Sequence, residues 1–101
     1  LDVSLALLPQ DIHPIEILAF GSRARGEYRP SSDLDVAVIL PDPPEDRVSI
    51  ALKMADVSFD ALLETGILIE ALPLWVSEWK GLATFSNPVL IEQIRKDGIS
   101  V

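Results

Sequence analysis

Two short polar segments, each placed where an apolar run ends or begins, restrict the possible fold of this chain more than its overall composition does. The first run, residues 15–20, stops at Gly21, and the second, residues 34–40, follows Asp33 and contains Asp35. Both runs are short and rich in bulky apolar residues, so both are predicted strands. Because side chains two apart on a strand point to one face, Asp33 and Asp35 are predicted to project together.

The glycine corner after the first run has the chemistry of a phosphate site. Gly21 has no Cβ, so the main chain can turn sharply there and a phosphate can approach it. Ser22 can donate its hydroxyl, and a short helix predicted over residues 22–27 offers free amide groups that favour an anion. Arg23 and Arg25 fall in the same segment and are candidates for neutralising phosphate charge. Solvated surface charge is the alternative role for each arginine.

The acidic pair has the chemistry of a metal site. The carboxylates of Asp33 and Asp35 repel each other unless a cation lies between them. Mg²⁺ suits this position because it takes hard oxygen ligands and keeps phosphate oxygens and water in its shell. A solvated strand end or a helix-capping arrangement is the alternative for two acids at this spacing, and the glycine-serine corner nearby favours the metal site.

The rest of the chain predicts an α/β architecture, a small mixed sheet with helices packed on it, in one domain over residues 1–101. A helix is predicted from about residue 45 to residue 64, ending at Gly66, because apolar residues recur there at spacings of three and four. The apolar positions that define this helix are Val48, Leu52, Ala55, Phe59, Leu62 and Leu63. A third strand is predicted over residues 67–72, stopped by Pro73.

Three further segments complete the expected order of elements. A helix fragment is predicted over residues 1–8, and a second helix over residues 88–96, with Asn87 as its N-cap and Gly98 at its end. Residues 99–101 are predicted as a last extended piece.

The segment 75–85 does not predict one structure, because Gly81 interrupts any long helix there. If it were helical, Trp75 and Trp79 would share one face, with core packing as their expected role. The single histidine, His13, lies before a proline and is expected on the surface. Without a histidine base nearby, Ser22 is not a candidate hydrolase nucleophile.

Composition narrows the classes of function. The chain has no cysteine, which excludes disulfides, thiolate metal sites and cysteine nucleophiles. Its net charge of −8 argues against extended nucleic-acid binding, which needs clustered cations. Every apolar run is far shorter than the roughly 20 residues that cross a bilayer, so no membrane span is expected. The sequence does not open on a pattern of signal-peptide type, so a cytoplasmic location is expected.

Taken together, the segment from Gly21 to Gly26 and the segment from Ser32 to Asp35 resemble the signature of the DNA polymerase β-like nucleotidyltransferase superfamily. Gly21-Ser22 is followed by ten residues and then by Asp33-Leu34-Asp35-Val36. The likeness is strongest to the small stand-alone members, the minimal nucleotidyltransferases of bacteria and archaea. The order of the remaining elements also fits the core of that fold.

This resemblance implies transfer of a nucleoside monophosphate, AMP from ATP or another nucleotide from its triphosphate, to an acceptor hydroxyl with release of pyrophosphate. The family's metal-binding pair corresponds to Asp33 and Asp35, and its phosphate-binding pair to Gly21 and Ser22. Two Mg²⁺ ions are expected, with Mn²⁺ as the alternative metal.

Active members of the superfamily usually carry a third carboxylate on the third strand, as a metal ligand and base. Glu70 is the candidate here, as a catalytic and metal-binding residue. A register shift of one residue would turn its side chain to the other face of the sheet, so its position depends on strand pairing. Asp60 and Glu64 on the preceding helix are the alternatives, although the amphipathic pattern places them in solvent.

The resemblance also implies a partner protein. Stand-alone members commonly occur beside a small helical HEPN protein, with which they form an antitoxin and toxin pair. The antitoxin can act by nucleotidylating its toxin, or, as an alternative, as a catalytically weak nucleotide-binding module that neutralises the toxin by complex formation. A core fragment whose acceptor-recognition domain is absent is a third interpretation, and self-association into a homo-oligomer stays open.

Overall fold

The computed structural model describes residues 12–21, 34–66 and 68–100. In chain order the elements are β1 (Glu16–Phe20), β2 (Leu34–Leu40), α2 (Arg47–Thr65), β3 (Ile69–Trp75), α3 (Val76–Trp79), α4 (Pro88–Asp97) and β4 (Ile99–Ser100). The helices predicted over residues 1–8 and 22–27 lie outside the described residues. Within the described part of the chain, no helix has both the length and the apolar character needed to cross a bilayer.

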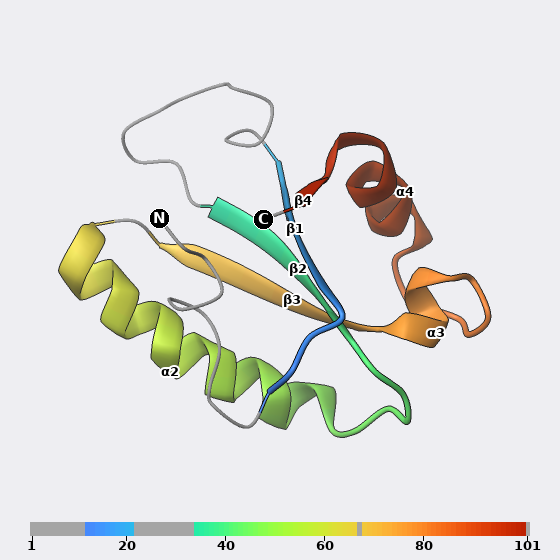
Figure 1. Ribbon diagram of the computed structural model, residues 1–101, viewed down its shortest axis with the longest axis horizontal. Helices are drawn as coiled ribbons and strands as arrows, with labels where there is room; N and C mark the ends of the chain where they lie inside the picture. The colour runs from blue at the N-terminus through green and yellow to red at the C-terminus, as the bar shows by residue number, and fades with distance from the viewer. Residues whose placement is uncertain (1–11, 22–33, 67, 101) are drawn as a thin grey trace.

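The strands form one mixed sheet in the order β3-β2-β1-β4 (Figure 1). Strand β1 pairs antiparallel with both β2 and β4, whereas β2 and β3 run parallel. The parallel pair is joined by α2, which is the crossover helix that a parallel connection requires. The expected α/β fold with a small mixed sheet is therefore confirmed.

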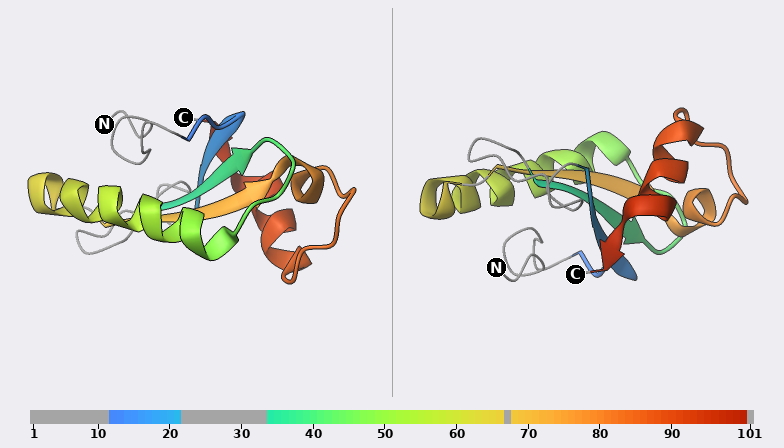
Figure 2. Two further views of the ribbon diagram at one scale, coloured as in Figure 1. Left: turned by 90° about the horizontal axis from the view of Figure 1, so that it is seen from below. Right: turned by 90° about the horizontal axis from the view of Figure 1, so that it is seen from above.

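Alternating side chains of β2 supply the two faces of the sheet. Val36, Val38 and Leu40 belong to the core that packs under α2. Ala37 and Ile39 belong to a second core, which packs against α3 and α4. The sheet is therefore a central layer between α2 on one face and the two C-terminal helices on the other (Figure 2).

The helix ends follow local capping rules. The side chain of Asp46 accepts a hydrogen bond from the Val48 amide, and Gly66 ends α2 in the left-handed conformation with φ 75°. Asn87 caps α4 through the Leu90 amide. The predicted limits of α2 and α4 are confirmed to within a few residues because these signals act over one turn of chain.

The apolar residues that define α2 in the sequence were expected to face the sheet, and this prediction is wrong for most of them. Val48, Leu52, Phe59 and Leu63 are exposed by 57% to 71% of their surface. The residues that α2 buries against the sheet are Ile50, Met54, Ser58 and Ala61. Both sets recur at helical spacing, and contact with the sheet, rather than periodicity, determines which one is buried.

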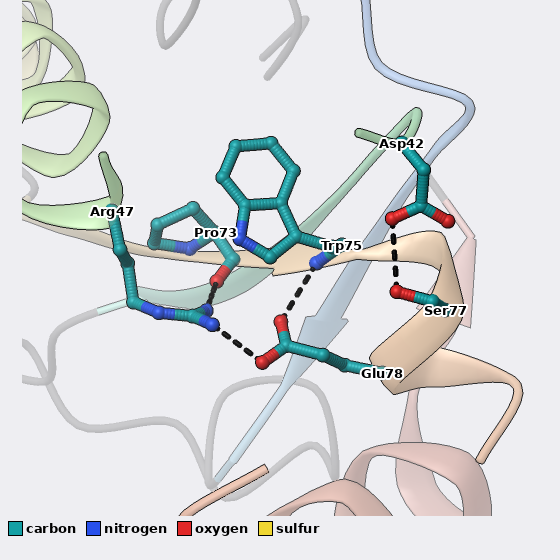
Figure 3. Close-up of polar contacts among 6 residues, drawn as sticks. All are labelled: Asp42, Arg47, Pro73, Trp75, Ser77 and Glu78. Atoms are coloured by element: carbon teal, nitrogen blue, oxygen red, sulfur yellow. Dashed lines mark hydrogen bonds and ion pairs between the residues drawn. The ribbon is translucent and has the colours of Figure 1, made fainter. Parts of the chain in front are cut away.

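The predicted end of the third strand at Pro73 is also wrong, because β3 continues through Pro73 to Trp75. In the described residues β3 is one of the two edge strands of the sheet, with β4 at the other edge, and is called the outer strand beside α2. The carbonyl oxygen of Pro73 accepts a hydrogen bond from Arg47 Nη1 at 2.5 Å, so it points away from β2 toward α2 (Figure 3). The ring nitrogen lies on the same outer side of the strand, where no ladder hydrogen bond is required of it.

A buried glutamate fixes the junction between β3 and α3 (Figure 3). Glu78 is 7% exposed, accepts a hydrogen bond from the Trp75 amide at 3.0 Å and forms an ion pair with Arg47 at 2.5 Å. The two tryptophans flank this junction on opposite faces. Trp75 packs in the core under α2, and Trp79 packs in the other core beside Arg95.

Candidate functional site

The candidate site begins at the sharp corner where β1 ends. Gly21 has φ +83°, a left-handed conformation that L side chains rarely adopt. A Cβ built on Gly21 would lie 2.6 Å from Oδ2 of Asp35, closer than real Cβ atoms come to any neighbour. Glycine is therefore required here for two reasons, the backbone angle and the space taken by the Asp35 carboxylate.

Strand pairing brings a second carboxylate to this corner. Asp35 on β2 is the register partner of Phe20 on β1 and of Glu70 on β3. In-register neighbours on adjacent strands are about 4.8 Å apart and point to the same face, so Glu70 lies beside Asp35. Asp35 is half-buried and Glu70 is exposed. Two acids from different strands thus meet next to Gly21.

These residues line an open cavity of about 470 Å³ on the face of the sheet that carries α4. Its lining consists of Phe20, Gly21, Asp35, Glu70, Ala71, Leu72, Leu90, Gln93 and Asp97. The strands form the floor, and α4 contributes one wall through Leu90, Gln93 and Asp97. The cavity therefore combines carboxylates, one amide and an apolar surface, a composition typical of a small-molecule site.

Helix α4 is held over the cavity by its inner face. Ile91 and Ile94 are buried against the sheet. Directly after the helix, β4 pairs with β1 through Ile99 and Ala19, which ties the end of α4 to the strand that carries the corner. Gln93 and Asp97 consequently face the cavity from the side of the helix next to its buried stripe.

The structure describes Gly21, Asp35 and Glu70 of the residues predicted for the site, and it brings all three together. Ser22, Arg23, Arg25 and Asp33 lie outside the described residues. Asp60 and Glu64, the alternatives to Glu70, are exposed on α2, and this helix covers the other face of the sheet. The catalytic and metal-binding roles assigned to the predicted residues remain predictions.

Sequence reasoning missed Gln93 and Asp97. Neither lies in a motif, and both are separated from Asp35 by more than half of the chain. Their only local signal is the N-cap at Asn87, which predicts the helix but not the face of the sheet on which it packs. The α4 wall of the cavity is a product of tertiary packing.

The donor set at the cavity fits a hard divalent cation. Asp35 and Glu70 supply carboxylate oxygens side by side, the ligand type that Mg²⁺ prefers. Among residues 12–21, 34–66 and 68–100, no group of three or more His, Cys, Asp or Glu side chains is arranged to hold a metal. Asp33 lies outside that range, and the sequence predicts it as the further ligand.

The chain belongs to the nucleotidyltransferase domain family, whose model matches residues 6–97. The resemblance to nucleotidyltransferases drawn from the sequence is therefore confirmed. Both Gly21 and Asp35 fall within the matched range, as does every residue that lines the cavity. No curated protein sequence matches the chain.

Solved structures with a similar fold include the following two. One is a toxin-antitoxin crystallised with AMP-PNP, with a TM-score of 0.61 and 17% identity. The alignment covers 97% of this chain and 65% of that one. The other is a candidate nucleotidyltransferase from Sulfolobus solfataricus, with a TM-score of 0.50, 23% identity and coverage of 86% of this chain and 61% of that one. The chain thus spans less than two thirds of the length of either structure, and at these identities the similarity shows the fold.

Proposed function

We propose that the chain is a metal-dependent nucleotidyltransferase that moves a nucleoside monophosphate, AMP from ATP, onto an acceptor hydroxyl. The observation that carries the proposal is the close approach of Asp35 to the glycine corner: Gly21 leaves room for the Asp35 carboxylate, and Asp35 has Glu70 as its register partner. A triphosphate at this corner would have backbone on one side and carboxylates on the other.

The reaction forms a bond between the acceptor oxygen and the α-phosphorus, while the bond from that phosphorus to the bridging oxygen breaks and pyrophosphate leaves. Glu70, exposed at the mouth of the cavity, is the base that takes the acceptor proton. Asp35 with Asp33 would hold Mg²⁺, with Mn²⁺ as an alternative, and Glu70 would complete the ligand set. When bound, the two ions supply charge stabilisation for the attacking and leaving oxygens.

The sequence assigns the remaining roles in this proposal. Gly21 and Ser22 bind the phosphates, the glycine through its main chain and the serine through its hydroxyl. Arg23 and Arg25 offset the charge that moves onto pyrophosphate as the bond breaks. The wall formed by α4 would confine the nucleotide, with Gln93 within the same cavity as the acids.

A second function is favoured by a separate observation, the similarity to a toxin-antitoxin crystallised with AMP-PNP. In this alternative the domain binds nucleotide but transfers it slowly, and neutralises a HEPN-type helical toxin in the cytoplasm by complex formation. The two functions are compatible if the toxin itself is the acceptor.

Titration calorimetry with a non-hydrolysable ATP analogue tests the site. Binding should depend on Mg²⁺, and Asp35→Asn should weaken it at least about tenfold because a metal ligand is lost. Glu16→Gln is the matched control, since Glu16 is exposed on β1 and takes no part in the cavity. Equal binding by Asp35→Asn and the control would contradict the proposal.

Transfer is tested separately from binding, with ATP labelled at the α-phosphate. Glu70→Gln should reduce label transfer by about 10²-fold or more, because a general base is lost, and this loss should exceed the loss of analogue affinity that removal of a metal ligand causes. Unchanged transfer would remove Glu70 from the mechanism. Mg²⁺-dependent binding without transfer in the unmodified chain would favour the slow, nucleotide-binding alternative.

A further inference from the structure

Helix α2 carries a second apolar face that the sheet does not cover. We define the outer stripe as Val48, Leu52, Ala55, Phe59 and Leu63, which recur at spacings of three and four along the helix. Its four large members are 66%, 63%, 57% and 71% exposed. Single exposed apolar residues are ordinary, but a continuous stripe along four turns of one helix is the mark of an interaction surface.

The outer stripe continues into a groove between α2 and the outer strand of the sheet. The groove has a volume of about 420 Å³. It is lined by Ala51, Ala55, Ser58 and Phe59 from α2 and by Leu68, Ile69, Glu70 and Ala71 from the start of β3 and the residue before it. Ala55 and Phe59 belong to both features, so stripe and groove form one surface. On the α2 side Ala51, Ala55 and Ser58 are small, and they leave space for the side chains of a second element.

The spacing of the outer stripe identifies the kind of element that fits. Apolar residues at intervals of three and four along a helix match the knobs of another helix laid alongside it, as in helix-in-groove recognition. An added strand would instead use the backbone of β3. At Pro73, however, the strand lacks an N–H, and its carbonyl oxygen is already bonded to Arg47. The occupant expected here is therefore a helix.

Charge distinguishes between a second copy and a different protein. Asp56, Asp60 and Glu64 are exposed and follow one another at intervals of four, so they form a row along one side of the outer stripe. Arg47, at the start of α2, is engaged by Glu78, and Lys53 is an exposed cation on the same side of the helix, so the three acids outnumber it along this row. In an antiparallel pair of copies packed through this face the two acidic rows would lie on the same side, and in any pairing each copy carries a net charge of −8. A partner with basic residues beside its apolar stripe avoids this repulsion.

We infer that the outer face of α2, with the groove beside β3, is a docking surface for an amphipathic helix of a partner protein that carries lysine or arginine along its flank. The surface does not require nucleotide transfer, because it lies on the side of the sheet away from α4. Glu70 lines both the groove and the candidate site, so a helix docked here ends next to the nucleotide cavity.

Fluorescence anisotropy with a synthetic probe tests the inference. The probe is a labelled helical peptide with leucine at heptad positions and lysine on its flanks, and the matched peptide carries glutamate in place of lysine. The lysine peptide should bind the full chain saturably below about 1 mM, more weakly as salt rises, and the glutamate peptide should bind at least about tenfold less tightly. No saturable binding, or equal binding of the two peptides, would overturn the inference.

Substitutions on the surface test whether the lysine peptide binds at the outer stripe. Leu52→Glu should weaken the lysine peptide by about tenfold or more, whereas Leu82→Glu should not, because Leu82 is a leucine of similar exposure, 80%, away from α2. Circular dichroism checks that both variants are folded. An equal loss of peptide affinity in the two variants would show that the peptide does not bind specifically at the outer stripe. Asp35→Asn should retain peptide binding, which separates a failure of this surface from a failure of the nucleotide site.

Two outcomes would assign the surface to another occupant. If the unmodified chain is a dimer by light scattering and Leu52→Glu is a monomer, the occupant is a second copy. If the lysine peptide binds only after residues 1–11 are removed, the occupant is the chain's own amino-terminal segment. Either result would overturn the docking of a separate basic helix.

Discussion

Single residues at the corner between β1 and β2 hold the candidate site together. Gly21 adopts φ +83° and leaves the space that one oxygen of Asp35 occupies. The carboxylate in turn lies beside its register partner Glu70. A substitution at Gly21 is therefore expected to shift Asp35 and, through it, the pairing of Asp35 with Glu70, although the glycine has no side chain to take part in chemistry.

Replacement of this glycine tests how closely the corner and the carboxylate are coupled. Gly21→Ala should destabilise the chain by about 1–2 kcal/mol from the left-handed backbone alone, because a Cβ meets the following carbonyl there. Contact of the new Cβ with Asp35 should displace the carboxylate and add about 1–3 kcal/mol. Urea unfolding measures the sum, and calorimetry should show Mg²⁺-dependent affinity for the ATP analogue reduced about tenfold or more.

Gly81→Ala is the matched control for the backbone contribution. Gly81 has φ +78°, and a Cβ there would meet nothing within 4 Å. Its loss of stability should stay near the backbone cost, and nucleotide affinity should not change. Equal effects of the two substitutions would mean that the approach of Asp35 to the corner has no consequence for the site.

At the scale of elements, α2 and β3 show how context overrides a local pattern. Helix α2 is apolar on two sides, and the sheet covers the side with Ile50 and Met54. Strand β3 continues through Pro73 because that residue lies on the outer strand and its carbonyl oxygen is satisfied by Arg47. In both elements the structure depends on contacts with a neighbouring segment, the sheet for α2 and Arg47 for β3, and the local sequence does not predict these contacts.

Substitution on the two sides of α2 should separate them by stability. Met54 is fully buried, so Met54→Ala should reduce the free energy of unfolding by about 2–5 kcal/mol through lost burial and the cavity left behind. Leu52→Ala should change it by no more than about 0.5 kcal/mol, because Leu52 is 63% exposed. Urea denaturation of both variants measures the difference. A larger loss at Leu52 would reverse the assignment of the buried side.

At the scale of the whole molecule, the sheet separates two surfaces for which different roles are proposed. The candidate site lies under α4, and the outer stripe with its groove lies along the outer side of α2. The two meet at Glu70, on the outer strand of the sheet. This arrangement allows a docked helix to lie beside the cavity without blocking the face on which a nucleotide would bind.

The net charge of −8 acts on every ligand of this molecule. A single-stranded oligonucleotide should not be retarded by the chain in a gel-shift experiment at low salt, because its phosphates meet an overall negative field. Mg²⁺ should not create such binding, because the proposed site takes one nucleotide. Retardation that weakens steeply with added salt would contradict this expectation and point to an extended nucleic-acid substrate.

Much of the fold and part of the site could be read from nearby residues. The strands at residues 15–20 and 34–40, the cap at Asn87 and the glycine at the end of α2 all depend on interactions within a few residues, which is why they were predictable. The motif from Gly21 to Asp35 is similarly compact, and the family match over residues 6–97 agrees with it.

Long-range packing settled the rest. Periodicity cannot say which of two apolar stripes of α2 faces the sheet, because both repeat at the same interval. Nor can it set the register that makes Glu70 the neighbour of Asp35, since a shift of one residue leaves the strand pattern intact but reverses its faces. Gln93 and Asp97 reach the cavity only because Ile91 and Ile94, on the adjoining side of α4, are buried against the sheet. These positions depend on contacts between segments that are distant along the chain, and local sequence patterns do not predict such contacts.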